Sequence, residues 1–179
     1  MFLTREEIEQ LINSGELVVE PRSAKTIFKA GLNLTLGNDI RVLVKGVNKL
    51  FLGKKDDKIK LKSLHKKIEP NKDGEVTFYP NYLYLASTNE YIKLPHNIIG
   101  FVKIHPTLAS SGFYTPPVVV RPKYEGKLYV LLVPPPFAIE VKVGTDFVQL
   151  LLAKATTLKT HIVKHGRTQH LSMHDLLNI

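Results

Sequence analysis

Apolar and polar residues alternate in short stretches over most of the chain, which is the two-residue period of a half-buried β-strand. Residues 32–36 have the sequence L-N-L-T-L, and residues 59–64 have I-K-L-K-S-L. Clusters of turn-forming residues, such as Gly37-Asn38-Asp39 and Thr88-Asn89, separate successive stretches. The pattern predicts strands at residues 17–19, 32–36, 40–44, 58–64, 75–79, 82–87, 91–94, 98–104, 118–120, 127–133, 138–143 and 147–152.

A helical pattern is present near the N-terminus. Thr4 and Glu7 form the capping-box sequence T-x-x-E, in which each side chain accepts a hydrogen bond from the other residue's backbone N–H. Apolar residues follow at three- and four-residue spacing, and Gly15 supplies the left-handed residue that often ends a helix. We therefore expect one amphipathic helix at residues 5–14, followed by an all-β barrel or sandwich.

Length and composition limit the number of domains. The chain has 179 residues, of which 44% are hydrophobic and 23% charged. These are ordinary values for one globular domain with a real core, and they exclude disorder over the whole chain. Hydrophobic density falls near the C-terminus. We expect a single β domain at residues 1–155 and a basic, mobile tail at residues 156–179.

The chain contains no cysteine and no long apolar run. A membrane span needs roughly 18 consecutive apolar residues, and the first residues, M-F-L-T-R-E-E-I-E-Q, lack the apolar centre of a signal peptide. Without cysteine the chain cannot form the thiolate-containing metal site of the zinc deaminases. We therefore expect a cytoplasmic protein without zinc and without a membrane contact.

Positive charge is concentrated in one stretch. Lys and Arg number 25 against 16 Asp and Glu, which gives a net charge of +9 and a pI near 9.6. Such a balance fits a polyanionic partner. Residues 45–67 hold nine lysines and two aspartates. Two interpretations stay open for this stretch: a solvated loop or hairpin, or a contact with nucleic acid, for which Phe51 alone offers an aromatic surface for stacking.

Five separated segments resemble the dCTP deaminase branch of the dUTPase superfamily. Residues 84–95, Y-L-A-S-T-N-E-Y-I-K-L-P, are similar to the family's L-A-S-T-x-E-x-x-x-L-P. Residues 32–42 resemble its V-D-L-R-L-G-N-E-x-R-V, with Asn33 in place of the usual Asp. The other three segments are the opening helix and strand at residues 3–21, Y-E-G-K-L at 124–128 and G-x-x-x-x-Q-L at 144–150.

The resemblance implies both an architecture and a chemistry. It implies a distorted β-barrel or jelly roll of the dUTPase-like type, assembled as a homotrimer with active sites shared between subunits and a C-terminal tail closing over each. Enzymes of the family bind a deoxynucleoside triphosphate with Mg²⁺, which is held through the phosphates, and they need no zinc. They deaminate dCTP to dUTP, or they hydrolyse dUTP to dUMP and pyrophosphate.

The position that matches the family's general base is Glu125, in Y-E-G. A buried carboxylate at this position could take a proton from water and pass it to the leaving ammonia. Tyr124 would then lie beside the deoxyribose. The alternative interpretation is that Glu125 is a surface glutamate in a turn, next to Gly126.

The phosphate-binding motif departs from the family's pattern. In place of R-S-S-L-G the chain has H-P-T-L-A at residues 105–109, where Pro106 offers neither an N–H nor a hydroxyl. Arg121 replaces the aspartate with which dUTPases activate water. Cationic and hydroxyl side chains could bind the phosphates instead. The candidate substrate-binding residues are Tyr124, Arg121, His105, Thr107, Ser110, Ser111, Lys123, Gln149, Lys164 and Arg167.

Three functions remain open from the sequence. The first is a dCTP deaminase-like enzyme of pyrimidine deoxynucleotide metabolism, with Glu125 as the base. The second is a catalytically degenerate family member that acts as a nucleic-acid- or protein-binding trimer, using the lysines of residues 45–67. The third is a dUTP diphosphatase that activates water with a different residue.

Overall fold

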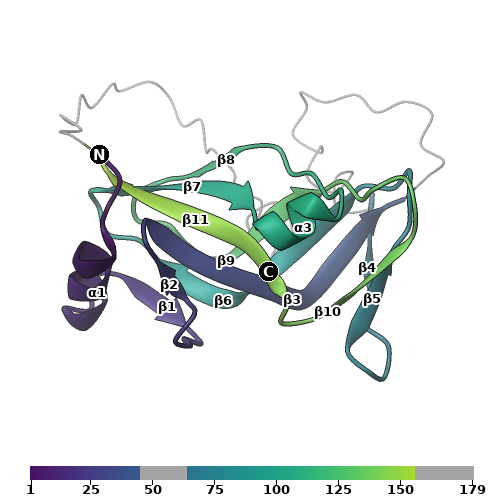
Figure 1. Ribbon diagram of the computed structural model, residues 1–179, viewed down its shortest axis with the longest axis horizontal. Helices are drawn as coiled ribbons and strands as arrows, with labels where there is room; N and C mark the ends of the chain where they lie inside the picture. Colours follow the sequence, from purple (N-terminus) through teal and green to yellow (C-terminus); the bar gives the residue numbers. More distant parts are fainter. Residues whose placement is uncertain (45–63, 156–179) are drawn as a thin grey trace.

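The computed structural model describes residues 1–44 and 64–155, and strands form most of it (Figure 1). Within these ranges nine strands join in one curled sheet, while β5 and β10 pair separately. The predicted all-β barrel with a short N-terminal helix is therefore confirmed. The elements are α1 (Arg5–Asn13), β1 (Val18–Glu20), β2 (Ile27–Phe28), β3 (Gly31–Leu43), β4 (His65–Ile68), β5 (Glu75–Phe78), β6 (Tyr84–Lys93), β7 (Ile98–Ile104), α3 (Pro106–Ser110), β8 (Val118–Val120), β9 (Glu125–Leu132), β10 (Ile139–Lys142) and β11 (Asp146–Lys154).

The sheet curls around the long strand β3. The first part of β3, residues 31–35, pairs with β11, and the second part, residues 36–43, pairs with β6 and β4. The register with β6 shifts between Leu36 and Ile40, which is a β-bulge, and a bulge bends the strand that contains it. Figure 1 shows this bend near the middle of β3. One strand thus belongs to both halves of the barrel.

The predicted turn at Gly37-Asn38-Asp39 is wrong, because these residues form the bulge inside one continuous strand. A turn and a bulge both favour glycine, but here the reason is the closeness of the neighbouring backbone. A Cβ atom at Gly37 would lie 2.5 Å from Ser87 Oγ and 2.6 Å from the Thr88 carbonyl oxygen. Only glycine lets β3 and β6 approach this closely.

The predicted break at Thr88-Asn89 is wrong for a related reason, since β6 also continues through a bulge. The Thr88 hydroxyl donates to the Glu90 carbonyl oxygen (2.8 Å) and accepts from the Leu128 N–H (3.0 Å). This side chain thereby satisfies backbone groups that the bulge leaves out of the regular ladder.

The other predicted elements agree with the structure in most places. Helix α1 has the full capping box between Thr4 and Glu7, and Gly15 follows it with φ of 75°. Strands β7 and β8 have the predicted bounds. The sequence interpretation missed the short elements β2, β4 and α3. The tail at 156–179 and the predicted strand at 58–64, except its last residue, lie outside the described residues.

The core fills the inside of the curled sheet. Phe78, Phe147 and Ile8 are fully buried, so β5, β11 and α1 all contribute to it. The Phe78 ring contacts Tyr84 edge-on, with centroids 4.8 Å apart, and contacts Phe113 at 5.4 Å. Burial of each such aromatic side chain contributes about 1.5–3 kcal/mol to folding. The core therefore fixes the strands whose ends carry the candidate site residues.

We predict that Gly37→Ala lowers the free energy of unfolding by about 1–3 kcal/mol, because the new methyl group overpacks the β3–β6 contact. Ser87→Ala serves as the control at the same contact. The buried Ser87 hydroxyl has no hydrogen-bond partner among the described residues, so its removal leaves stability unchanged or raises it. Urea denaturation followed by circular dichroism measures both variants. Equal stabilities of Gly37→Ala and the parent protein would contradict the close approach.

Candidate active site

The turn that leads into β9, together with the first residue of that strand, holds the candidate residues Arg121, Lys123, Tyr124 and Glu125. The Tyr124 N–H donates to the Arg121 carbonyl oxygen (3.2 Å), and Lys123 takes a positive φ of 63° between them. The Lys123 N–H donates to the Pro95 carbonyl oxygen, and the Tyr124 carbonyl oxygen accepts from the Leu94 N–H. These bonds fix the turn against the segment that joins β6 to β7.

Glu125 begins β9 and lies opposite Lys93 of β6. Its carboxylate accepts a hydrogen bond of 2.5 Å from the Tyr91 hydroxyl, and Lys93 Nζ lies 3.3 Å from its second oxygen. The Tyr91 hydrogen bond, with a smaller contribution from Lys93, holds the pKa of Glu125 below its usual value. The same hydrogen bond raises the pKa of Tyr91. Glu125 is therefore ionised at neutral pH.

The burial expected for Glu125 is not found in the single chain, where 53% of its side chain is exposed. Its paired, exposed carboxylate is a weaker base than a carboxylate whose pKa has been raised toward neutrality by burial. Tyr124 is half-buried against the core, and its hydroxyl donates to the Lys127 carbonyl oxygen (2.6 Å). A catalytic role for Glu125 thus requires a further surface that covers it.

The segment expected to bind phosphates lies around α3. His105 caps this short helix. Its side-chain Nδ1 accepts a hydrogen bond from the Thr107 N–H (3.4 Å), and its backbone N–H donates to the Phe147 carbonyl oxygen. The hydroxyls of Ser110 and Ser111 both donate to the Thr107 carbonyl oxygen, at 2.9 and 3.0 Å. Since a hydroxyl has one proton to donate, neither serine side chain has a donor left for a phosphate in this arrangement.

The two groups of candidate residues lie at opposite ends of β7 in one chain. Val120, just before the turn at 121–125, pairs with Gly100 near the start of β7, whereas His105 follows its end. Five residues of extended strand separate these points, which is roughly 16 Å. The single chain therefore does not bring Glu125 and His105 together.

Gln149 belongs to a polar row inside the sheet. It pairs with Asn33 of β3 on one side and Lys103 of β7 on the other. Its Nε2 donates to Asn33 Oδ1 (2.9 Å), and Asn33 Nδ2 donates to the Lys25 carbonyl oxygen (2.9 Å). The side chain is nearly buried, so these bonds connect β11 to β3 and to the segment before β2. Lys164 and Arg167 lie outside the described residues.

A charged network that the sequence interpretation missed joins β3 to β9. Arg41 binds both Asp39 oxygens, at 3.0 Å each, and the Tyr129 hydroxyl donates to Asp39 Oδ2 (2.7 Å). Burial raises the pKa of Asp39, but the hydrogen bonds from Arg41 and Tyr129 outweigh burial and hold it below its usual value. Burial and the Asp39 carboxylate raise the pKa of Tyr129. The sequence does contain a signal for the Asp39–Arg41 pair, because residues two apart lie on the same face of a strand. The contact with Tyr129 could be predicted only from the register between strands.

Comparisons with known proteins identify the family. A family model described as dCTP deaminase-like matches residues 2–155, so the chain belongs to the dCTP deaminase-like family. Among curated proteins, a "dCTP deaminase" of Acidianus ambivalens is 29% identical over 88% of this chain and 86% of its own length. A "Probable deoxyuridine 5'-triphosphate nucleotidohydrolase" of Sulfolobus islandicus rod-shaped virus 1 is 32% identical over the same shares of the two chains. The predicted family is confirmed, and with it an enzyme family.

Solved structures support the same fold. The crystal structure of 2'-deoxycytidine 5'-triphosphate deaminase from Agrobacterium tumefaciens matches with a TM-score of 0.66 and 18% identity, covering 87% of this chain and 48% of that one. A variant of the Staphylococcus bacteriophage 80alpha dUTPase matches with a TM-score of 0.50 and 10% identity, covering 84% and 98%. These likenesses confirm the predicted dUTPase-like fold. No helix in residues 1–44 and 64–155 is long and apolar enough to cross a membrane.

We predict that Asp39→Asn lowers the free energy of unfolding by about 1.5–3 kcal/mol near neutral pH, the usual contribution of hydrogen bonds to a charged group. Because the folded-state pKa of Asp39 lies below its unfolded value of 3.8, its stabilisation is full above that value and is lost as pH falls through the folded pKa. The difference between the parent and the variant is therefore constant above about pH 5 and shrinks below about pH 4.

Urea denaturation across this pH range measures the difference. The control is Glu9→Gln, which breaks the exposed ion pair with Arg5 and changes stability by less than about 1 kcal/mol. A gap between the parent and Asp39→Asn that persists unchanged at low pH would contradict the lowered pKa of Asp39.

Proposed function

We propose that the chain is an enzyme that binds a pyrimidine deoxynucleoside triphosphate in the cytoplasm and hydrolytically deaminates dCTP to dUTP. The family match over residues 2–155 carries this proposal. Relatives from Acidianus and Pyrobaculum that are named dCTP deaminase, at 29% and 31% identity, support it over nearly their full length. Arg121, where dUTPases are expected to carry an aspartate, favours deamination over dUTP hydrolysis.

In the proposed reaction Glu125 acts as the general base. Its carboxylate takes a proton from water, the hydroxide adds to C4 of the cytosine ring, and the proton passes to the amino group, which leaves as ammonia. The balance is dCTP plus water giving dUTP plus ammonia. The hydrogen bond from Tyr91 and the ion pair with Lys93 keep Glu125 ionised before substrate binds. Tyr124, the preceding residue, would contact the deoxyribose.

Basic side chains would bind the triphosphate. The candidate residues His105, Arg121 and Lys123 are basic or uncharged, a donor set that suits phosphate oxygens rather than a metal ion. We therefore propose that Mg²⁺ is held by the phosphates, where it neutralises part of their charge. No zinc is required.

The site we propose is completed by a second subunit. Glu125 is exposed in one chain and lies at the other end of β7 from His105. In a homotrimer the α3 end of one subunit would cover the 121–125 turn of another. This arrangement would shield Glu125 from bulk solvent while leaving room for the reacting water, and it would make Glu125 the stronger base that deamination needs.

The activity is tested by incubating the protein with dCTP or dUTP and Mg²⁺ and separating the products by chromatography. We expect dUTP and ammonia from dCTP. Glu125→Gln should lower turnover at least about 100-fold.

Tyr91→Phe removes the hydrogen bond that lowers the pKa of Glu125, so the acid limb of the pH–rate profile for dCTP turnover should move to higher pH. Release of dUMP and pyrophosphate from dUTP would instead support the activity named for the viral relative.

Two results would contradict the proposal. Absence of any product from either nucleotide would contradict the enzymatic function. Full turnover by Glu125→Gln would assign Glu125 to a surface ion pair with Lys93 and the base to another residue.

Mixing of two variants tests the shared site. We expect Glu125→Gln and His105→Ala homotrimers each to be impaired. Trimers formed from a one-to-one mixture should recover activity, because about a quarter of the sites then combine an intact Glu125 of one subunit with an intact His105 of another. If both residues served the same site from one chain, no mixed trimer would contain an intact site and activity would not recover.

A further inference from the structure

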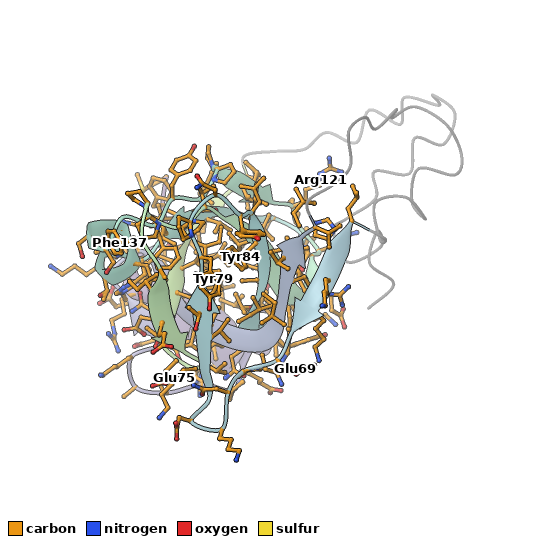
Figure 2. The ribbon with its side chains drawn as sticks, turned by 90° about the vertical axis from the view of Figure 1, so that its right-hand side faces the viewer. Glu69, Glu75, Tyr79, Tyr84, Arg121 and Phe137 are labelled. Carbon is orange, nitrogen blue, oxygen red and sulfur yellow. The ribbon has the colours of Figure 1, made fainter. Side chains whose placement is uncertain are left out.

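A hollow lined by aromatic side chains lies at one end of the barrel, away from the turn at 121–125. It has a volume of about 560 Å³. Its lining residues are Tyr79, Tyr82, Tyr84, Pro80, Thr77 of β5, Val42 of β3 and Ile68 of β4. Figure 2 looks onto this end of the molecule, and Tyr79 and Tyr84 lie in the middle of the view, between the strands.

The hollow has a fixed floor and an exposed rim. Tyr84 is 2% exposed, and its ring packs edge-on against Phe78. Its hydroxyl accepts a hydrogen bond of 2.8 Å from the Tyr79 N–H. The Tyr82 ring lies at 53° to that of Tyr84, with centroids 6.5 Å apart. Tyr79 stands at the rim with 55% of its surface exposed. Tyr79 is therefore exposed to solvent, Tyr82 is half-buried beside it, and the buried Tyr84 gives both a fixed base.

One positively charged residue, Lys66, stands on the sheet face that lines the hollow. Lys66 pairs with Val42, and it stands two residues from Ile68, hence on the face of β4 that lines the hollow. None of the ion pairs formed among the described residues involves Lys66. Lys67 neutralises Glu69, the nearest acidic residue along β4 and its continuation.

We propose that this hollow binds the bases of a single-stranded nucleic acid. Tyrosine faces stack on any base, and a cationic side chain such as that of Lys66 binds a phosphate between bases, which is the chemistry of sequence-tolerant single-strand binding. The net charge of +9 attracts the same polyanion over a longer range. The occupant is distinct from the proposed dCTP substrate, since the hollow shares none of its lining residues with the candidate active site.

The test measures fluorescence anisotropy of short labelled single-stranded DNA and RNA on addition of the full-length protein. Tyr79→Ala combined with Tyr82→Ala should raise the Kd at least about tenfold for loss of base stacking. Lys66→Ala should weaken binding and reduce the slope of log Kd against log salt by about one, because one phosphate contact is lost. Titrations between about 50 and 200 mM salt give this slope. The DNA and RNA arms show which backbone is preferred.

The matched control is Phe2→Ala, which truncates an exposed aromatic ring that contacts Phe101, outside the hollow. This variant should bind the oligonucleotides as the parent does. An unchanged Kd for the double tyrosine variant, or a preference for duplex over single strands, would overturn the proposal. Displacement of the oligonucleotide by excess dCTP would also overturn it. Because dCTP turnover by the tyrosine variant should equal that of the parent, failure here leaves the proposed deaminase activity unaffected.

Discussion

The close backbone contact between β3 and β6 at Gly37 is the constraint on which the rest of the structure depends. It lets one strand bend through a bulge and pair with β11 on one side of the bend and with β6 on the other. Strand β6 supplies Tyr91 and Lys93, the two partners of Glu125. Strand β11 supplies Gln149 and pairs with β7, at whose end His105 begins α3. Both parts of the candidate site are therefore positioned through this single bend.

Three carboxylates in the described structure differ in what surrounds them. Glu90 is almost fully buried and accepts hydrogen bonds from the Thr35 N–H and hydroxyl, and Asp39 is held by Arg41 and Tyr129. Their oxygens are bound to protein donors, so they join strands. Glu125 also has two partners, but it is open to solvent on one side. Under the proposed function, that openness leaves Glu125 available to a substrate, and the proposed second subunit would cover it.

Local sequence signals identified the elements that depend on neighbours in the chain. The capping box predicted α1, and five separated motifs predicted the family. Local sequence signals did not predict features that depend on a neighbouring strand. Gly37 allows a close contact between strands rather than a turn. Tyr91 contacts Glu125 only because of the register between β6 and β9. In the same way, the lysine-rich segment contains few aromatic residues, yet the pairing of β4 with β3 places Lys66 opposite Val42, which lines the hollow together with tyrosines from a later part of the chain.

The order of strands in the sheet also bears on how the chain is made. The side chains of Asn33 and Gln149 are bonded although they are 116 positions apart, and β11, the last strand described, lies between β3 and β7. A ribosome releases the N-terminal strands first. The inner apolar faces of β3 and β7 therefore stay exposed to water and unconnected to each other until β11 has been synthesised. Such late, non-local pairing makes closure of the barrel a slow step and exposes the nascent protein to aggregation before it is complete.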